Sequence, residues 1–229
     1  MSDLTLSSVK LCYAGLADPV LDISKLRLDA GSHIAITGAS GSGKSSLVNI
    51  ISGLERASDG KVLWDDVDLC TLSETARERW RAANIGLVLQ DFYLFSGLSA
   101  LENVLLPVRL GRVRFRVEHR KRAEHLLKRV GLARADQPVQ TMSRGEMQRV
   151  AVARALVTKP KILIADEPTA SLDEASGLAV GDLLIELARE EAATLLVVSH
   201  DAQLVSRMER RIRLSRGKIT ETATPEYAA

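Results

Sequence analysis

The residues best suited to chemistry in this chain form a glycine-rich loop, GASGSGKS, at positions 38–45. The spacing, a glycine, four residues and then Gly-Lys-Ser, is that of a phosphate-binding loop, whose backbone N–H groups wrap a phosphate chain. The loop lies between an apolar run and a helical pattern, which is the context that such a loop requires. This context favours phosphate binding over the alternative, a glycine-rich turn without a ligand. We therefore expect Lys44 to reach the β- and γ-phosphates of a nucleotide and the Ser45 hydroxyl to bind Mg²⁺.

Two acidic residues end a second apolar run, KILIADEP, at positions 161–168. Asp166 closes a predicted buried strand and can hold Mg²⁺ through water. Alternation along a strand predicts that Glu167 points away from Asp166, so that Glu167 can act as a general base or orient an attacking water. An acidic strand end leading into a turn at Pro168 is the alternative.

A third apolar run, TLLVVSH, ends in His200. A lone histidine is more often structural than functional. The place of His200 at the same sheet edge as the phosphate-binding loop and Asp166 favours a functional role.

A polar loop that runs into a helix, MSRGEMQRVAVARAL, covers residues 142–156. Ser143 and Glu146 have the spacing of a capping box, which predicts a helix start. A capped helix start with the Ser143 hydroxyl and the Gly145 N–H is also an anion site. The chain already has one phosphate loop, so a second anion site is useful if it meets the nucleotide of another subunit.

The elements that must position these residues alternate between strand and helix. Continuous apolar strands separated by helices predict a parallel sheet covered on both faces. The predicted strands are 33–38, 161–166 and 194–200, and the predicted helices are 44–54, with Leu47, Val48, Ile50, Ile51 and Leu54 on one face, and roughly 173–191.

The remaining segments differ from this core. Signals from about 92 to 157 are mostly helical and predict a helical insertion. Residues 4–32 and 61–70 have the pattern of antiparallel strands, and RRIRLSRGKITE predicts a hairpin with its turn near Arg216 and Gly217. We expect one domain over residues 1–229.

Composition excludes several classes of protein. Aromatic residues make up 3% of the chain and the formal charge is +2, which argues against stacking platforms for nucleic acid and against binding nucleic acid by charge alone. Cys12 and Cys70 lack metal-ligand spacing and fit free thiols in a reducing compartment. The first residues, MSDLTLSSVK, lack the apolar region of a signal peptide, and the best apolar run is TLLVV at 194–198. We expect a cytoplasmic protein that does not span a membrane.

Together these motifs resemble the ATP-binding subunit of an ABC transporter, over nearly the whole chain. The resemblance rests on GASGSGKS, MSRGEMQRVAVARAL, ILIADEP, TASLD (169–173) and VVSHD, in this order along the chain. It implies a P-loop NTPase core with a parallel sheet, an N-terminal antiparallel β subdomain and an inserted helical subdomain at roughly 92–157. It also implies ATP and Mg²⁺ as ligands, and ATP contacts by Tyr13, Gly38, Ala39, Ser40, Gly41, Ser42, Gly43, Lys44, Ser45, Ser46, Ser143 and Gly145.

The resemblance gives further residues a role. Gln90 in IGLVLQDF would lie at the hinge of the helical subdomain, touch Mg²⁺ or water, and report the γ-phosphate to the transporter. Tyr13 would stack on adenine, although an ordinary strand aromatic is the alternative. Asp173 would lie at the interface of two copies that sandwich two ATP molecules. Arg144 replaces a family glycine, and it could support the ATP-bound dimer, point to solvent or cripple the site.

A narrower resemblance concerns TARERWRAANIGLVLQDFYLFSGLSALENVLLPVRL, which is similar to the lipoprotein-releasing, macrolide-exporter and cell-division ATPases. It implies integral membrane permease subunits as partners and a peripheral position on the cytoplasmic face of the inner membrane. Phe92, Tyr93 and Phe95 either line a groove for a helix of the membrane subunit or belong to the core. The basic run 112–122 is either a solvated helix face or a contact with lipid head groups or an acidic loop.

Two other functions are compatible with these motifs. A soluble ABC-type ATPase acting on ribosomes or DNA would usually carry paired cassettes or long coiled coils, and this chain has one cassette and no long heptad run. A nucleotide-dependent scaffold with little turnover is suggested by Arg144 alone.

Overall fold

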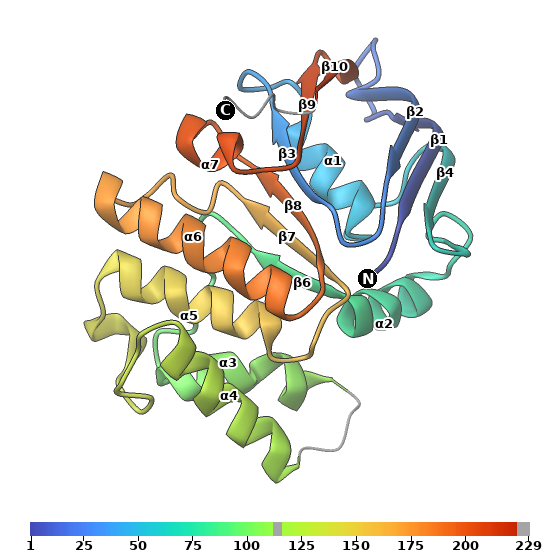
Figure 1. Ribbon diagram of the computed structural model, residues 1–229. Helices are drawn as coiled ribbons and strands as arrows, with labels where there is room; N and C mark the ends of the chain where they lie inside the picture. The colour runs from blue at the N-terminus through green and yellow to red at the C-terminus, as the bar shows by residue number, and fades with distance from the viewer. Residues whose placement is uncertain (112–115, 224–229) are drawn as a thin grey trace.

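The computed structural model describes residues 1–111 and 116–223, arranged as two sheets with helices between and beside them (Figure 1). The smaller sheet is antiparallel, with strand order β2-β1-β4-β5. Its strands alternate between buried and more exposed residues, as expected for a sheet with one solvated face. They are β1 (Leu4–Leu11), β2 (Leu21–Leu28), β4 (Asp59–Trp64) and β5 (Val67–Asp68).

The larger sheet has the strand order β10-β9-β3-β8-β7-β6. Its pairs are parallel except for β9 with β10, which form the predicted C-terminal hairpin. The central strands are buried along their length because helices or the other sheet cover both faces. The strands are β3 (His33–Thr37), β6 (Ile85–Val88), β7 (Ile162–Asp166), β8 (Thr194–Val198), β9 (Arg210–Ser215) and β10 (Lys218–Ala223).

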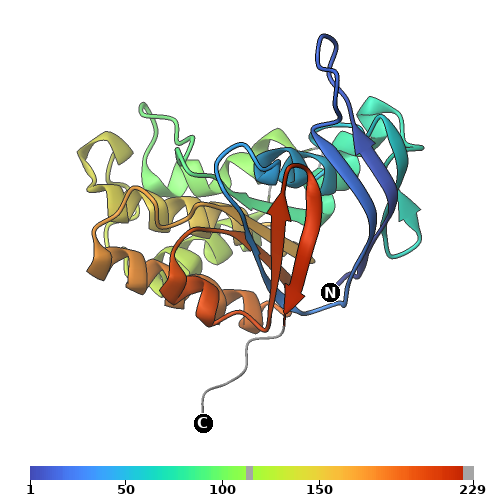
Figure 2. The same cartoon turned by 90° about the horizontal axis from the view of Figure 1, so that it is seen from above.

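Two cores lie on opposite faces of the larger sheet. On β7, Ile162 and Ile164 pack toward the antiparallel sheet, while Leu163 and Ala165 pack toward the helices. Helix α1 (Lys44–Ile51) lies between the two sheets, as Figures 1 and 2 show. Its buried apolar residues belong to the core on the side of the antiparallel sheet.

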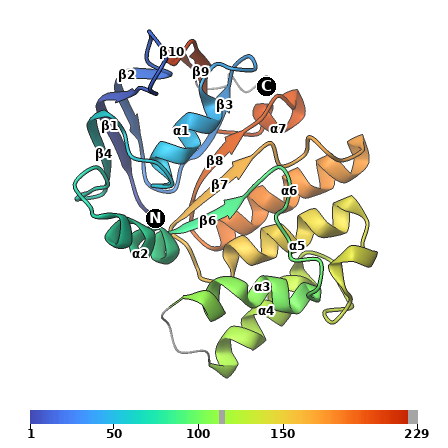
Figure 3. The ribbon, with the colours of Figure 1, turned by 180° about the vertical axis from the view of Figure 1, so that it is seen from behind.

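The other helices mostly cover the second face or flank it. Helices α5 and α6 lie against the larger sheet, and α3 and α4 pack beyond α5, as the view from behind shows (Figure 3). The helices are α2 (Glu74–Asn84), α3 (Ala100–Leu110), α4 (Val117–Arg129), α5 (Arg144–Leu156), α6 (Glu174–Glu190), α7 (Ala202–Ser206) and a 3₁₀ turn (Val139–Thr141).

The predicted fold class is confirmed, with two corrections in detail. Helix α1 ends at Ile51, so Leu54 lies beyond it and is 43% exposed rather than on its buried face. Helix α2 and strand β6 were not predicted. Part of the basic run, residues 112–115, lies outside the described residues, while Arg116 and the start of α4 are exposed.

The division into a core and a helical subdomain at roughly 92–157 stays a prediction, although α3, α4 and α5 all fall in that range. Among the described residues, no helix has both the length and the apolar character needed to cross a membrane.

Candidate nucleotide-binding site

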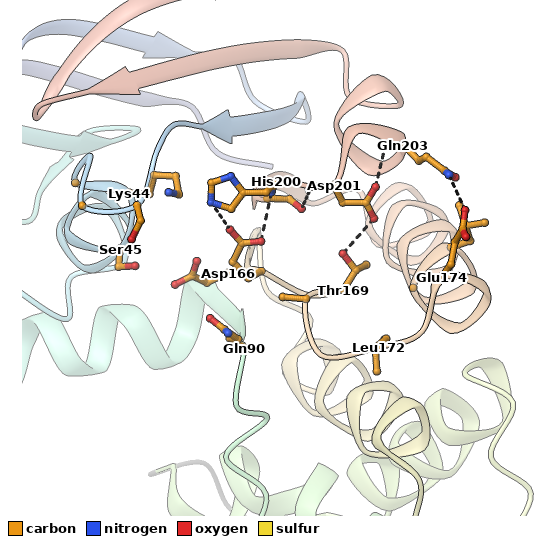
Figure 4. Close-up of a pocket in the computed structure, with 18 of the residues that line it drawn as sticks. Lys44, Ser45, Gln90, Asp166, Thr169, Leu172, Glu174, His200, Asp201 and Gln203 are labelled. Carbon is orange, nitrogen blue, oxygen red and sulfur yellow. Dashed lines mark hydrogen bonds and ion pairs between the residues drawn. The ribbon is translucent and has the colours of Figure 1, made fainter.

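A cavity of about 740 Å³ opens at the carboxyl ends of the parallel strands β3, β7 and β8. Ligands of open α/β sheets bind at this edge, because the loops after the strands meet there. Figure 4 shows that Lys44, Ser45, Gln90, Asp166 and His200 approach one another from separate segments. The cavity therefore unites the three motifs that the sequence analysis took from distant positions in the chain.

The glycines of the 38–45 loop allow a backbone path that other residues would not follow easily. Gly43 precedes α1 with φ 101°, in the left-handed region. Gly38 has φ 153°, and a Cβ placed on it would lie 2.3 Å from the carbonyl oxygen of Leu214. The first turn of α1 has no side-chain cap and no acidic residue. Its free N–H groups and positive dipole end therefore face the loop, as an anion site requires.

Lys44 lies inside this loop and is nearly buried. Its Nζ donates hydrogen bonds to the carbonyl oxygens of Gly38, at 2.8 Å, and of Ala39, at 3.0 Å. These neutral acceptors hold the ammonium group near the loop without neutralising its charge. The charge remains available to an anion that enters the cavity.

Asp166 is the last residue of β7 and faces Lys44 and Ser45. Burial raises the pKa of the Asp166 carboxyl, while the charge of Lys44 and a hydrogen bond with Ser45 oppose this rise. A cation bound beside Asp166 would offset the cost of burying its charge. The two oxygen-bearing side chains, Ser45 and Asp166, are the hard ligands that Mg²⁺ prefers.

Glu167 leaves the strand abruptly, with φ 47°, and its N–H donates to the carbonyl oxygen of Val198. Its carboxylate Oε1 lies 3.2 Å from Nε2 of His200, and the backbone N–H of His200 donates to Oε2 at 3.4 Å. Strand alternation does not set the direction of Glu167 relative to Asp166, because Glu167 lies outside the strand in a left-handed conformation. Both residues line the same cavity.

The pKa of Glu167 is raised, chiefly by burial and to a smaller extent by the negative charge of Asp166. His200 and Lys44 act in the opposite direction. A non-glycine residue with positive φ is held there by its surroundings at some cost, and such strain occurs often at functional sites. A partly buried carboxylate with a raised pKa beside a histidine has the properties of a general base.

The cavity contains residues that the sequence analysis did not select as a site. Thr169 Oγ1 donates to Asp201 Oδ2 at 3.2 Å, and this contact joins the loop after β7 to the loop after β8. Asp201 also caps α7 through Oδ1. Gln203 and Glu174 line the far wall, where Gln203 Nε2 donates a hydrogen bond to Glu174 Oε1 at 3.3 Å. Thr169 directly follows Asp-Glu-Pro at 166–168, and Asp201 directly follows Ser-His at 199–200. Their position next to these motifs is the feature of the sequence that could have identified them as site residues.

Other predicted residues lie outside the cavity lining. Ser143 and Glu146 form the predicted capping box of α5, with Ser143 Oγ accepting from the N–H of Glu146 at 3.3 Å. Gly145 follows within α5, near Ser176 at the start of α6. The predicted ATP contacts Tyr13, Gly38, Ala39, Ser42, Ser143 and Gly145 are not among the lining residues.

Tyr13 is 41% exposed, and its hydroxyl donates to Glu55 Oε2 at 2.9 Å. Partial burial and Glu55 raise the pKa of the Tyr13 phenol, so the ring remains neutral. It is therefore not packed inside the core as an ordinary strand aromatic would be.

Comparison with known proteins gives a consistent result. The ABC transporter family matches residues 21–170. The lipoprotein-releasing system ATP-binding protein LolD of Hydrogenovibrio crunogenus is 42% identical over 222 residues, or 95% of this chain and 96% of that protein. The ABC transporter ATP-binding protein YbbA of Escherichia coli K12 is 44% identical over 200 residues, or 87% of each chain. The dimeric bacterial ABC transporter cassette MJ0796 superimposes with a TM-score of 0.88 at 35% identity, over 97% of this chain and 99% of that chain.

Proposed function

The chain belongs to the ABC transporter family as an ATP-binding and ATP-hydrolysing subunit, and we propose that ATP binds and reacts in the cavity described above. One observation carries this proposal: the phosphate-loop residues Lys44 and Ser45 share a cavity with Asp166 and the Glu167–His200 pair. These groups supply a phosphate cradle, metal ligands and a base in one place. This combination is what ATP hydrolysis requires.

The loop from Gly38 to Ser46 is proposed to hold the phosphates, with Lys44 moving from its two carbonyl acceptors toward the β- and γ-phosphate oxygens. Within residues 1–111 and 116–223, no group of three or more His, Cys, Asp and Glu side chains is placed to hold a metal ion by itself. Mg²⁺ usually combines one or two protein ligands with phosphate oxygens and water. Ser45, Asp166 and Gln90 fit that arrangement, in which Mg²⁺ would neutralise charge on the phosphates.

Glu167 is proposed to orient the attacking water and to accept its proton. The water oxygen would bond to the γ-phosphorus as the bond to the β,γ-bridging oxygen breaks, giving ADP and inorganic phosphate. His200 holds the Glu167 carboxylate in place through Nε2, and its ring is exposed enough to reach a γ-phosphate oxygen. The 3.2 Å contact therefore positions the base before ATP binds.

A second copy of this chain is proposed to complete each site. The solved MJ0796 cassette includes a dimer in a post-hydrolysis state bound to ADP and inorganic phosphate. Ser143 and Gly145 lie at the amino end of α5, where free N–H groups favour an anion, and they would meet the ATP of the partner copy. Asp173 would lie at the same interface, and Tyr13 would stack on adenine.

A membrane subunit is proposed to dock beside Gln90, on the cytoplasmic face of the inner membrane. A second cavity, of about 370 Å³, lies between α2, β6, α3 and α5 and includes the edge strand β6 and Leu110. Leu110, which lines this cavity, is 78% exposed, and Tyr93 and Phe95, outside its lining, are 62% and 59% exposed. These exposed apolar side chains are proposed to contact a helix of the membrane subunit. LolD belongs to a lipoprotein-releasing system, and we propose lipoprotein release or a similar mechanical task for this chain.

The proposal is tested by measuring ATP binding and hydrolysis by the purified chain with Mg²⁺. Lys44→Ala should reduce turnover by at least about 100-fold, because a preorganised charge on the transferred phosphate is lost. The matched control is Lys61→Ala, which removes an exposed lysine from β4, outside the cavity lining. Near-normal turnover by Lys44→Ala would place ATP hydrolysis elsewhere.

A further inference from the structure

Arg144, the residue that departs from the family pattern, contacts two segments that belong to different parts of the nucleotide site. Its Nε donates a hydrogen bond to the carbonyl oxygen of Ser171 at 3.1 Å. Its guanidinium lies over the ring of Phe92, with 5.4 Å between Cζ and the ring centroid. This distance is within the range of a cation–π contact. The arginine therefore neither extends freely into solvent nor stands alone at the amino end of α5.

The Ser171 contact reaches the wall of the cavity. Thr169, Leu172 and Asp173 line the cavity, and Figure 4 shows the loop that carries Thr169 and Leu172 running from the cavity toward Glu174 in α6. Ser171 lies within this loop, and its side chain does not line the cavity. A bond to its carbonyl oxygen acts on the path of the backbone.

The Phe92 contact reaches the segment that follows Gln90. Phe92 is 6% exposed, and both Phe92 and Tyr93 have positive φ, 58° and 46°. Arg154, in the last turn of α5, donates from Nη2 to the carbonyl oxygen of Phe92 at 2.5 Å and from Nη1 to that of Tyr93 at 2.6 Å. Two arginines at opposite ends of α5 thus hold this unusual turn. Arg144 contacts the ring of Phe92, and Arg154 binds the carbonyl oxygens of Phe92 and Tyr93.

We propose that Arg144 is a positioning residue for ATP hydrolysis, which ties the loop 169–173 to the segment 91–95 through the start of α5. The two contacts need the donor at Nε and the flat face of the guanidinium. Lysine supplies neither the Nε donor nor the flat face, although it keeps the positive charge. This inference rests on the proposed function for its effect on turnover, but the tie itself is a property of the folded chain.

A purely electrostatic role for Arg144 makes a different prediction. A cation near the amino end of a helix is unfavourable until an anion arrives, so Arg144 could serve by attracting the phosphates of the partner's ATP. Lysine is also a competent phosphate binder as a point charge. The variant Arg144→Lys therefore separates the two roles, because it keeps the charge but cannot reproduce both contacts with the geometry of the guanidinium.

The first test is amide hydrogen exchange of the full nucleotide-free chain, read in peptides that cover 90–95 and 169–173. Both segments contain turn hydrogen bonds whose amides report local opening, such as Phe92 N–H to Leu89 O and Leu172 N–H to Thr169 O. We expect both peptides to exchange about three- to tenfold faster in Arg144→Lys and Arg144→Gly, the factor that corresponds to the loss of such contacts. The matched control is Arg149→Lys, five positions further along α5, where Arg149 lies against Gly131.

The second test is steady-state hydrolysis with Mg²⁺ and ATP. We expect kcat to fall about three- to tenfold in Arg144→Lys and Arg144→Gly, with the KM for ATP within about twofold of the original value, because Arg144 does not line the cavity. Phe92→Leu keeps an apolar residue but removes the ring face. The double variant Phe92→Leu, Arg144→Lys should have a kcat no lower than that of the weaker single variant, because both substitutions disrupt the same connection between the two segments.

Three results would overturn the proposal: an Arg144→Lys variant that exchanges and hydrolyses like the original chain, faster exchange in only one of the two peptides, or additive losses in the double variant. If the Lys44→Ala variant hydrolyses ATP as fast as the original chain, the proposed site of hydrolysis is wrong instead. The exchange experiment still decides whether Arg144 joins the two segments in that case.

Discussion

The exchange of Glu167 for glutamine tests the proposed chemistry with little change in shape. The amide has almost the volume of the carboxylate, and its oxygen can still face Nε2 of His200 at about the observed 3.2 Å. The amide nitrogen would then face the backbone N–H of His200, whose 3.4 Å contact is long and contributes little. The charge that was buried near Asp166 also disappears, so the folded state should not be weakened.

The expected loss of turnover is about 10²- to 10⁴-fold, the usual contribution of a general base. ATP binding should persist, because Lys44, Ser45 and Asp166 are unchanged. The variant should therefore accumulate as an ATP-bound dimer. Phosphate release measures the first effect, and light scattering with ATP and Mg²⁺ measures the second. Glu186→Gln, an exposed change on α6 outside the cavity lining, is the matched control.

The raised pKa of Glu167 adds a pH test to the same assay. As the pH falls through this raised pKa, the carboxylate takes up a proton and can no longer accept one from water. Turnover by the original chain should decline on acidification above the range of an ordinary glutamate. The decline should be smaller in the residual turnover of Glu167→Gln, in which Asp166 but not residue 167 still takes up a proton. Near-normal hydrolysis by Glu167→Gln, or loss of its ATP binding, would refute the assignment of Glu167 as base.

Two further predictions concern the partner surface and the metal ligand. Replacing Tyr93 and Phe95 together by lysine should abolish co-purification with the membrane subunit and move Tm by less than about 4 °C, because both side chains are exposed; unfolding of the variant would instead place them in the core. Asp166→Asn should abolish Mg²⁺-dependent hydrolysis yet raise the Tm of the nucleotide-free chain at pH 8. Burial raises the folded-state pKa of Asp166, so its ionised form is destabilising above that pKa and this effect is relieved as the pH falls through it. The gain in Tm should therefore shrink in acid, and a gain independent of pH would contradict this reasoning.

The parallel strands were predictable from the sequence because burial on both faces leaves continuous apolar runs, as in residues 162–166 and 194–198. Helix α2 was not, since it is largely polar and charged and its buried residue is Arg77, which donates from Nε to the carbonyl oxygen of Gly53. Strand β6 has four residues with a glycine among them, too short a run to indicate a strand. Local patterns fail where an element is stabilised by distant polar contacts or is very short.

The meeting of Lys44, Asp166 and His200 was predictable for a topological reason. Parallel strands end at one edge of a sheet, so motifs that follow such strands must gather there. The orientation of Glu167 was not predictable, because alternation applies only while the chain remains in the strand. The left-handed turn at Glu167 places both carboxylates in one cavity.

Arg144 shows why a departure from a family pattern is judged by what the new side chain touches. Within the loop, the sequence offered only a lost glycine and a cation at an unfavourable helix end. The compensating acceptor lies 27 positions away at Ser171, and the ring beneath the guanidinium belongs to Phe92. Neither partner has a spacing that marks it, since both contacts arise from loops that the fold brings to the start of α5. Where the family glycine allowed a bare helix end, the arginine connects the cavity wall to the segment that faces the proposed membrane partner.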